Sequence, residues 1–167
     1  MGKLLLGDSS MINNNLKYCR EELEMTQQEL GYVFGVSKNT VSGWENAHDT
    51  MPFNKLIRFC NLYDFSMEFV VGFIRKNTKY DKIKTDKKKI GSKLKAIRNE
   101  LNLSQQQLAD DCKISQTTYS TYETGRYLIN TITIYTICKK YNISMDYLVG
   151  RTNNKKLKKK KKRGYAK

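Results

Sequence analysis

The feature that most constrains the fold is an internal repeat. Residues 16–72 align with residues 94–150 at a constant offset of 78 residues, without a gap. Many positions are identical, and most substitutions keep the character of the side chain, as with Trp44 and Tyr122. Self-similarity over this length indicates two copies of one fold, called copy one and copy two below.

Each copy has the pattern of five short helices. In the first helix, apolar residues recur every three or four positions: Ile12, Leu16, Cys19 and Leu23 in copy one, and Ile90, Leu94, Ile97 and Leu101 in copy two. Thr26 with Glu29, and Ser104 with Gln107, predict a capping box at the start of the second helix. Serine N-caps are expected at Ser37, Ser66, Ser115 and Ser144. We therefore predict an all-α fold.

The net charge of +15 lies mostly outside the two copies. We expect copy one to occupy residues 10–74 and copy two residues 90–150, with a basic linker at 75–89 and a disordered polybasic tail at 151–167. Residues 1–74 carry −3 and copy two +2, whereas the linker carries +6 and the tail +10. This distribution favours a polyanionic partner, attracted mainly by the linker and the tail.

The third helix of each copy is expected to have one buried and one exposed face. The inward positions are Val41 and Trp44, or Tyr119 and Tyr122, and the opposite face is polar. A short exposed helix that begins at a serine cap suits insertion into the major groove of DNA. The alternative is a polar face that is simply solvated.

These motifs together resemble the phage-repressor (Cro/Xre-type) helix-turn-helix family. The matching segments are MTQQELG at 25–31 and VSKNTVSGWEN at 36–46 in copy one, and LSQQQLA at 103–109 and ISQTTYSTYE at 114–123 in copy two. The segments SMEF and SMDYL, which begin at Ser66 and Ser144, also match. The resemblance implies two tandem lambda-repressor-like domains with double-stranded DNA as the partner.

The resemblance also implies which residues contact DNA. Gln27 and Gln105, which open the second helix, are expected to bind a phosphate. Base edges are expected to face Lys38, Asn39 and Gly43 in copy one, and Gln116, Thr117 and Thr121 in copy two. Ser37 and Ser115 are caps that also approach the DNA backbone, and Arg126 follows the third helix of copy two. Lysine can donate to guanine, and an amide can pair with adenine.

Two departures from the family pattern distinguish the copies. The turn glycine of the family is Gly35 in copy one but Lys113 in copy two, at a cost of about 1–2 kcal/mol if the left-handed backbone is retained. The glycine after the third helix is Gly125 in copy two but Ala47 in copy one. We expect copy two, with Arg126 and the adjacent tail, to bind DNA more tightly.

An arginine and a glutamate recur 25 residues apart in both copies. They are Arg20 with Glu45, and Arg98 with Glu123. The resemblance implies that each pair is a structural ion pair, which ties the first helix to the end of the third.

The sequence therefore predicts a non-enzymatic, sequence-specific DNA-binding regulator, and a repressor rather than an activator. We expect a bacterial or phage-encoded protein that is located in the cytoplasm and associated with the nucleoid. No cofactor, metal site or membrane association is expected, because the sequence lacks a catalytic or metal-binding constellation and a long apolar run. The linker could span up to about 50 Å, which suggests a covalent pseudo-dimer on a non-palindromic site. The alternatives are a nonspecific nucleic-acid-compacting protein and an antitoxin-like module, with a homodimer or a protein partner bound through one copy.

Overall fold

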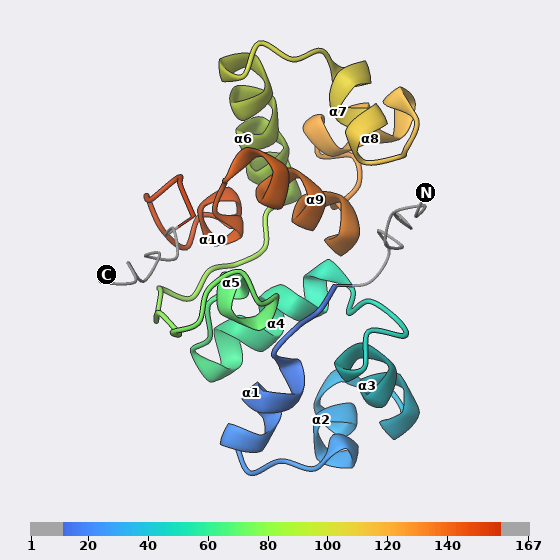
Figure 1. The fold of residues 1–167 in the computed structure, drawn as a ribbon, viewed down its shortest axis with the longest axis vertical. Helices are drawn as coiled ribbons and strands as arrows, with labels where there is room; N and C mark the ends of the chain where they lie inside the picture. Colours follow the sequence, from blue (N-terminus) through green and yellow to red (C-terminus); the bar gives the residue numbers. More distant parts are fainter. Residues whose placement is uncertain (1–11, 158–167) are drawn as a thin grey trace, which may run out of the picture.

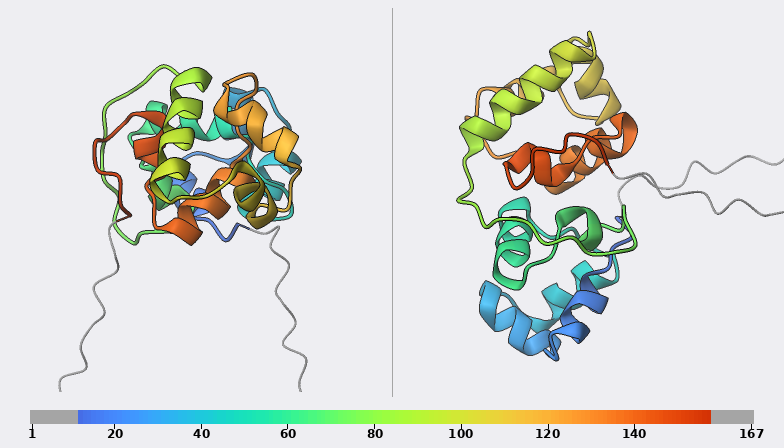
Figure 2. Two further views of the ribbon diagram at one scale, coloured as in Figure 1. Left: turned by 90° about the horizontal axis from the view of Figure 1, so that it is seen from above. Right: turned by 90° about the vertical axis from the view of Figure 1, so that its left-hand side faces the viewer.

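The computed structural model describes residues 12–157 and confirms an all-α fold with five helices in each copy. Copy one contains α1 (Leu16–Glu22), α2 (Gln27–Phe34), α3 (Lys38–Glu45), α4 (Phe53–Tyr63) and α5 (Met67–Val70). Copy two contains α6 (Lys87–Glu100), α7 (Gln105–Asp111), α8 (Gln116–Glu123), α9 (Thr131–Tyr141) and α10 (Met145–Val149). The two copies form two lobes along the longest axis (Figures 1 and 2).

The serine and threonine caps form where the sequence predicts them. The side chains of Thr26 and Ser104 complete capping boxes at the starts of α2 and α7. Serine side chains accept a backbone N–H at the starts of α3, α5, α8 and α10. Both turns between the second and third helices are left-handed, with φ of 62° at Gly35 and 55° at Lys113. Copy two thus keeps the turn geometry without the glycine.

The first helix of copy one is shorter than the sequence predicts. Ile12 is buried but precedes α1, which starts at Leu16. The side chain of Asn14 accepts the N–H of Leu16 at 2.9 Å and donates to the carbonyl of Trp44 at 2.9 Å. Asn15 bonds to carbonyls of α5 through its backbone N–H at 2.7 Å and through its side chain at 2.8 Å. Because asparagine side chains compete with helical hydrogen bonds, this stretch stays outside the helix.

The first helix of copy two begins seven positions earlier in the repeat, inside the predicted linker. Asp86 caps it by accepting the N–H groups of Lys88 and Lys89. A Cβ on Gly91 would lie 2.4 Å from the carbonyl oxygen of Tyr122, and one on Gly125 would lie 2.6 Å from Cα of Lys88. These two glycines allow the first turns of α6 to lie directly against the end of α8.

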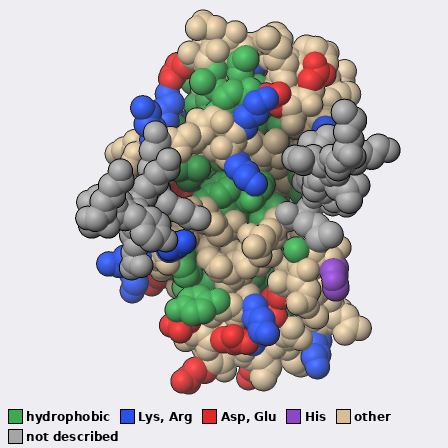
Figure 3. Space-filling model, in the orientation of Figure 1, with side chains coloured by type: hydrophobic (Ala, Val, Ile, Leu, Met, Phe, Trp, Pro, Cys, Tyr) green, Lys and Arg blue, Asp and Glu red, His purple; other side chains and the backbone are tan. Residues whose placement is uncertain are grey.

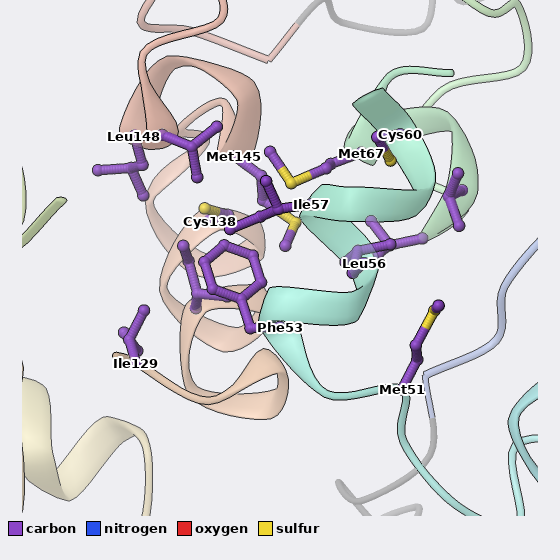
Figure 4. Close-up of a cluster of buried hydrophobic side chains, with 14 of the residues drawn as sticks. Met51, Phe53, Leu56, Ile57, Cys60, Met67, Ile129, Cys138, Met145 and Leu148 are labelled. Carbon is purple, nitrogen blue, oxygen red and sulfur yellow. The ribbon is translucent and has the colours of Figure 1, made fainter. Parts of the chain in front are cut away.

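A continuous buried core extends across both copies. In Figure 4, Phe53 and Ile57 of α4 lie beside side chains from the second copy, including Ile129, Cys138 and Met145. Three of the cysteines, Cys19, Cys60 and Cys138, are buried free thiols, and Cys112 is half-buried. The two copies are therefore packed against each other through an apolar interface.

The remainder of the linker is also held in place, so it does not use the span of up to about 50 Å that its length would allow. The side chain of Asn77 accepts the N–H of Ser66 and donates to the carbonyl of Asp64, both at 2.9 Å. Asn61 of α4 donates to the carbonyl of Ile83 at 2.7 Å. These contacts fix the linker along the surface of copy one.

The start of the predicted disordered tail belongs to the folded domain. Arg151 is buried, and the backbone N–H of Ser144 donates to the carbonyl of Lys155 at 2.8 Å. Ile143 and Lys156 form an isolated antiparallel β-bridge. The polylysine run and Arg163, like the first residues assigned to copy one, lie outside the described range of 12–157.

Candidate nucleic-acid interface

The third helices, α3 and α8, each bury one face and expose the other. Val41, Trp44, Tyr119 and Tyr122 are buried against their own copy. The helix starts are fixed by Ser37, whose Oγ accepts a backbone N–H at 3.1 Å, and by Ser115, whose Oγ accepts one at 3.0 Å. The opposite face of each helix is left to solvent.

The predicted base-reading residues lie on this outer face with different degrees of freedom. Lys38 and Asn39 of α3, and Thr117 of α8, are exposed, while Gly43, Gln116 and Thr121 are half-buried. Thr121 donates its hydroxyl proton to a carbonyl of its own helix at 2.7 Å. Copy one therefore presents two exposed side chains at the start of its third helix, whereas copy two presents one exposed side chain and two more constrained ones.

Each third helix is fixed at its C-terminal end by a buried ion pair. Arg20 Nε lies 2.5 Å from Glu45 Oε1, and Arg98 Nε lies 2.6 Å from Glu123 Oε1. Each arginine also donates to a backbone carbonyl just before the second helix, which is that of Met25 at 2.7 Å in copy one and that of Leu103 at 2.8 Å in copy two. The pairs join the first helix, the loop that follows it and the end of the third helix, as the resemblance implies.

The ion pair in copy two also shifts the protonation equilibrium of its glutamate. Burial alone would raise the pKa of Glu123, but hydrogen bonds from Arg98 and Gln105 outweigh it and lower the pKa below its usual range. The carboxylate therefore remains ionised at neutral pH. An ionised acceptor makes the hydrogen bonds that hold α8 stronger.

The glutamines at the start of the second helix connect the ion pairs to the outer surface. Gln27 Nε2 donates to Glu45 Oε2 at 2.8 Å, and Gln105 Nε2 donates to Glu123 Oε2 at 2.7 Å. In copy two, Gln116 Nε2 also donates to Gln105 Oε1 at 2.6 Å. An amide nitrogen has two hydrogens, so each glutamine keeps one amide hydrogen beyond the one that it donates to its glutamate.

A family model described as helix-turn-helix matches residues 16–70 and again residues 94–148. These matches contain α1–α5 and most of α6–α10. The chain belongs to the helix-turn-helix family.

A curated relative is similar to part of this helix-turn-helix chain. It is the uncharacterized HTH-type transcriptional regulator YobD of Bacillus subtilis (strain 168), which is 28% identical over 62 residues. The aligned region covers 37% of this chain and 55% of the relative. The chain therefore spans little more than half the length of that regulator.

The helix-turn-helix unit of copy two is flanked by basic side chains that sequence reasoning assigned to the linker. Lys87 Nζ donates to the carbonyl of Arg126, just after α8, at 2.9 Å. Lys88, Lys89 and Arg126 are exposed. The sequence signal for this arrangement is Gly91, because copy one has no glycine at the equivalent position. In Figure 3, acidic side chains instead gather over the lower end of the molecule, which copy one forms.

Residues 12–157 contain no group of three or more metal-ligating side chains placed to hold an ion. None of the helices in this range is both long and apolar enough to cross a membrane.

Proposed function

We propose that the chain binds double-stranded DNA sequence-specifically, that α3 and α8 read base edges in the major groove, and that binding regulates transcription. The observation that carries this proposal is the polar face that each third helix exposes while a cap and a buried ion pair fix its two ends. Pre-organised donors lose little conformational entropy on binding, and this favours base-specific contacts.

Phosphate contacts would set the position of each helix in its groove. The free amide hydrogens of Gln27 and Gln105 are suited to this role, because each amide is already oriented by a glutamate. Arg126 and the lysines at the start of α6 add positive charge beside α8. Phosphate contacts orient a protein on the duplex, and base contacts select the sequence.

We further propose that the protein is a repressor. Repression requires only that the bound chain exclude other proteins from a promoter, and an intact pair of DNA-binding domains is sufficient for that. The similarity to a regulator from Bacillus subtilis supports a regulatory role in a bacterium or its phage, in the cytoplasm with the nucleoid.

The test is selection from a randomised duplex pool at physiological salt, followed by sequencing of the retained DNA. We expect enrichment of a two-part motif with centres about one helical turn apart. Retention of DNA without enrichment would contradict the proposal and favour nonspecific compaction. Absence of DNA binding together with co-purification of a small protein would favour the antitoxin-like alternative.

Variants assign each half of the motif to one copy. The double substitution Lys38→Ala and Asn39→Ala should remove base preference from one half, and Gln116→Ala with Thr117→Ala should remove it from the other. Each good base contact contributes about 1–3 kcal/mol of discrimination. Lys17→Ala and Lys95→Ala are matched controls, because these exposed residues occupy the same position of the repeat on the first helix.

A further inference from the structure

The two copies contact each other through equivalent residues of their last helices. Glu68 of α5 and Asp146 of α10 occupy the same position of the repeat. Glu68 Oε1 accepts the backbone N–H of Asp146 at 3.1 Å and the hydroxyl of Ser144. Asp146 Oδ2 in turn accepts the backbone N–H of Met67 at 2.8 Å. Each carboxylate therefore caps the start of the other copy's last helix.

A second reciprocal contact involves the residues that follow these helices. Phe73 of copy one stacks on Tyr135 of α9, with ring centroids 4.7 Å apart. Arg151, which is the equivalent of Phe73 in copy two, reaches back to copy one and donates to the carbonyls of Cys60 at 3.2 Å and Phe65 at 3.0 Å. The same position of each copy thus contacts the fourth-helix region of the other.

A third contact lies where the chain enters α4 and α9. A groove of about 390 Å³ is lined by residues 50 and 52–54 of copy one and residues 128–132 of copy two, which cover equivalent stretches of the repeat. Thr131 Oγ1 donates to the carbonyl of Met51 across this boundary at 2.6 Å. All three contacts join a surface of copy one to the same surface of copy two.

An interface of this kind is isologous, and it relates the two copies by an approximate two-fold rotation. Repeats stacked by translation would instead use two different surfaces. Figures 1 and 2 agree with the rotation, since α4–α5 and α9–α10 meet at the middle of the long axis and α2–α3 and α7–α8 lie at its opposite ends, both on the right in Figure 1. A two-fold rotation about an axis that points at the DNA reverses the direction along the duplex in which α8 lies relative to α3.

We propose that a single chain binds an operator whose two half-sites are inverted, unlike in sequence and held at one fixed spacing. This inference rests on the proposed function. The inversion follows from the two-fold relation, and the unlike sequences follow from different reading residues, such as Lys38 in α3 and Gln116 in α8. The spacing is fixed because a buried interface joins the copies and the linker is bound to copy one. The chain therefore binds its operator in one orientation.

The experiment starts from the two-part motif selected by the full chain. Four duplexes are compared: the selected layout, a version with one half-site reversed to give a direct repeat, and versions with 5 or 10 base pairs inserted between the halves. Fluorescence anisotropy gives Kd for each duplex, and native mass spectrometry gives the number of chains per duplex.

We expect one chain per duplex, and a loss of affinity of at least about tenfold for the reversed duplex and for both insertions, since a good base contact contributes about 5- to 150-fold. Equal affinity for the direct repeat would overturn the inverted layout. Full recovery at the 10-base-pair insertion would overturn the fixed spacing. Two chains per duplex would overturn reading by a single chain.

A linker variant shows whether the interface between the copies or the length of the linker fixes the spacing between the half-sites. Four Gly and Ser residues inserted between the exposed Lys84 and Thr85 lengthen the linker without altering the interface. We expect the preference among the four duplexes to stay unchanged, whereas new tolerance of the longer spacing would overturn the proposal. A selected motif with the wrong layout refutes this inference alone, while selection that yields no motif refutes the proposed function as well.

Discussion

The first helices of the two copies, α1 and α6, differ more than the repeat suggests, and the difference comes from two glycine positions. Gly91 and Gly125 let the start of α6 lie against the end of α8. Copy one has Asn13 and Ala47 at these positions, and its first helix begins only at Leu16. The two glycines therefore allow the earlier start of α6, whereas hydrogen bonds of Asn14 and Asn15 keep the corresponding stretch of copy one outside the helix.

Because α1 is shorter than α6, the end of α3 is contacted by a different group from the one that contacts the end of α8. In copy one, the side chain of Asn14 donates to the carbonyl of Trp44, where copy two brings the backbone of Gly91 close to Tyr122. In copy two, the additional helical turn places Lys87 beside Arg126. Copy one thus has a polar side chain at the end of its third helix, and copy two has a basic extension of its first helix, formed by Lys87, Lys88 and Lys89.

Removal of the buried ion pairs tests whether the stability of the two copies depends on these pairs equally. Glu123→Ala and Glu45→Ala should each lower the free energy of unfolding by about 3–5 kcal/mol, because a buried arginine is left without its partner. Urea denaturation measures this loss. Glu22→Ala on the exposed part of α1 is the control, expected within about 0.5 kcal/mol of the wild type. A loss of DNA affinity with unchanged stability would show that the glutamates act by contact instead.

Gly91→Ala tests the packing that distinguishes copy two. The new Cβ would lie 2.4 Å from the carbonyl oxygen of Tyr122, and such overpacking costs about 1–3 kcal/mol. Asn13→Ala at the equivalent position of copy one should change stability by less than about 0.5 kcal/mol. Thermal melts of both variants provide the comparison. Equal effects in the two copies would mean that close approach of α6 and α8 does not distinguish them.

The copies also differ at the interface, where Arg151 replaces Phe73 and donates a hydrogen bond to Asp146 Oδ1 at 2.6 Å. Burial, and then the adjacent Glu68, raise the pKa of Asp146 to about 9. The folded chain thus holds a proton that the unfolded chain releases near pH 4. This contribution to stability is present at low pH and is lost as the pH rises towards about 9.

Glu68→Gln removes the neighbouring negative charge and should flatten this dependence. Between pH 6 and pH 9, stability of the variant relative to the wild type should increase by up to about 1 kcal/mol per pH unit. Urea denaturation at four pH values measures it, with Glu22→Gln on the exposed surface as the control. Parallel profiles for the wild type and Glu68→Gln would exclude a role for Glu68 in the raised pKa.

The smallest expected effect concerns the basic extension of α6. Lys87→Gln combined with Lys88→Gln should reduce the slope of log affinity against log salt by about 1–2, since each phosphate contact contributes about 0.9. The selected motif should not change, because phosphate contacts carry no base information. Lys95→Gln on the same helix is the control. An unchanged slope in the double variant would remove the extension from the DNA interface.

Much of the local structure was predictable from the sequence because its signals are short-range. A cap such as Ser37 and its N–H partner lie three residues apart, so the pattern indicates the start of α3 directly. The assignment of residues on α3 and α8 to DNA contact was based on the same helices and remains a prediction. The start of α1 was not predictable, because Asn14 and Asn15 bond to segments distant in sequence.

The sequence by itself determined that the chain contains two copies of one helical domain and which helices each copy forms. Only the tertiary structure decided how the copies are arranged. Apolar residues such as Phe53 and Ile57 have the same pattern whether they are buried within one copy or between two. From the sequence, Arg151 was assigned to the predicted disordered tail as its first charge. Its burial depends on carbonyl and carboxyl groups that come together only in the folded chain.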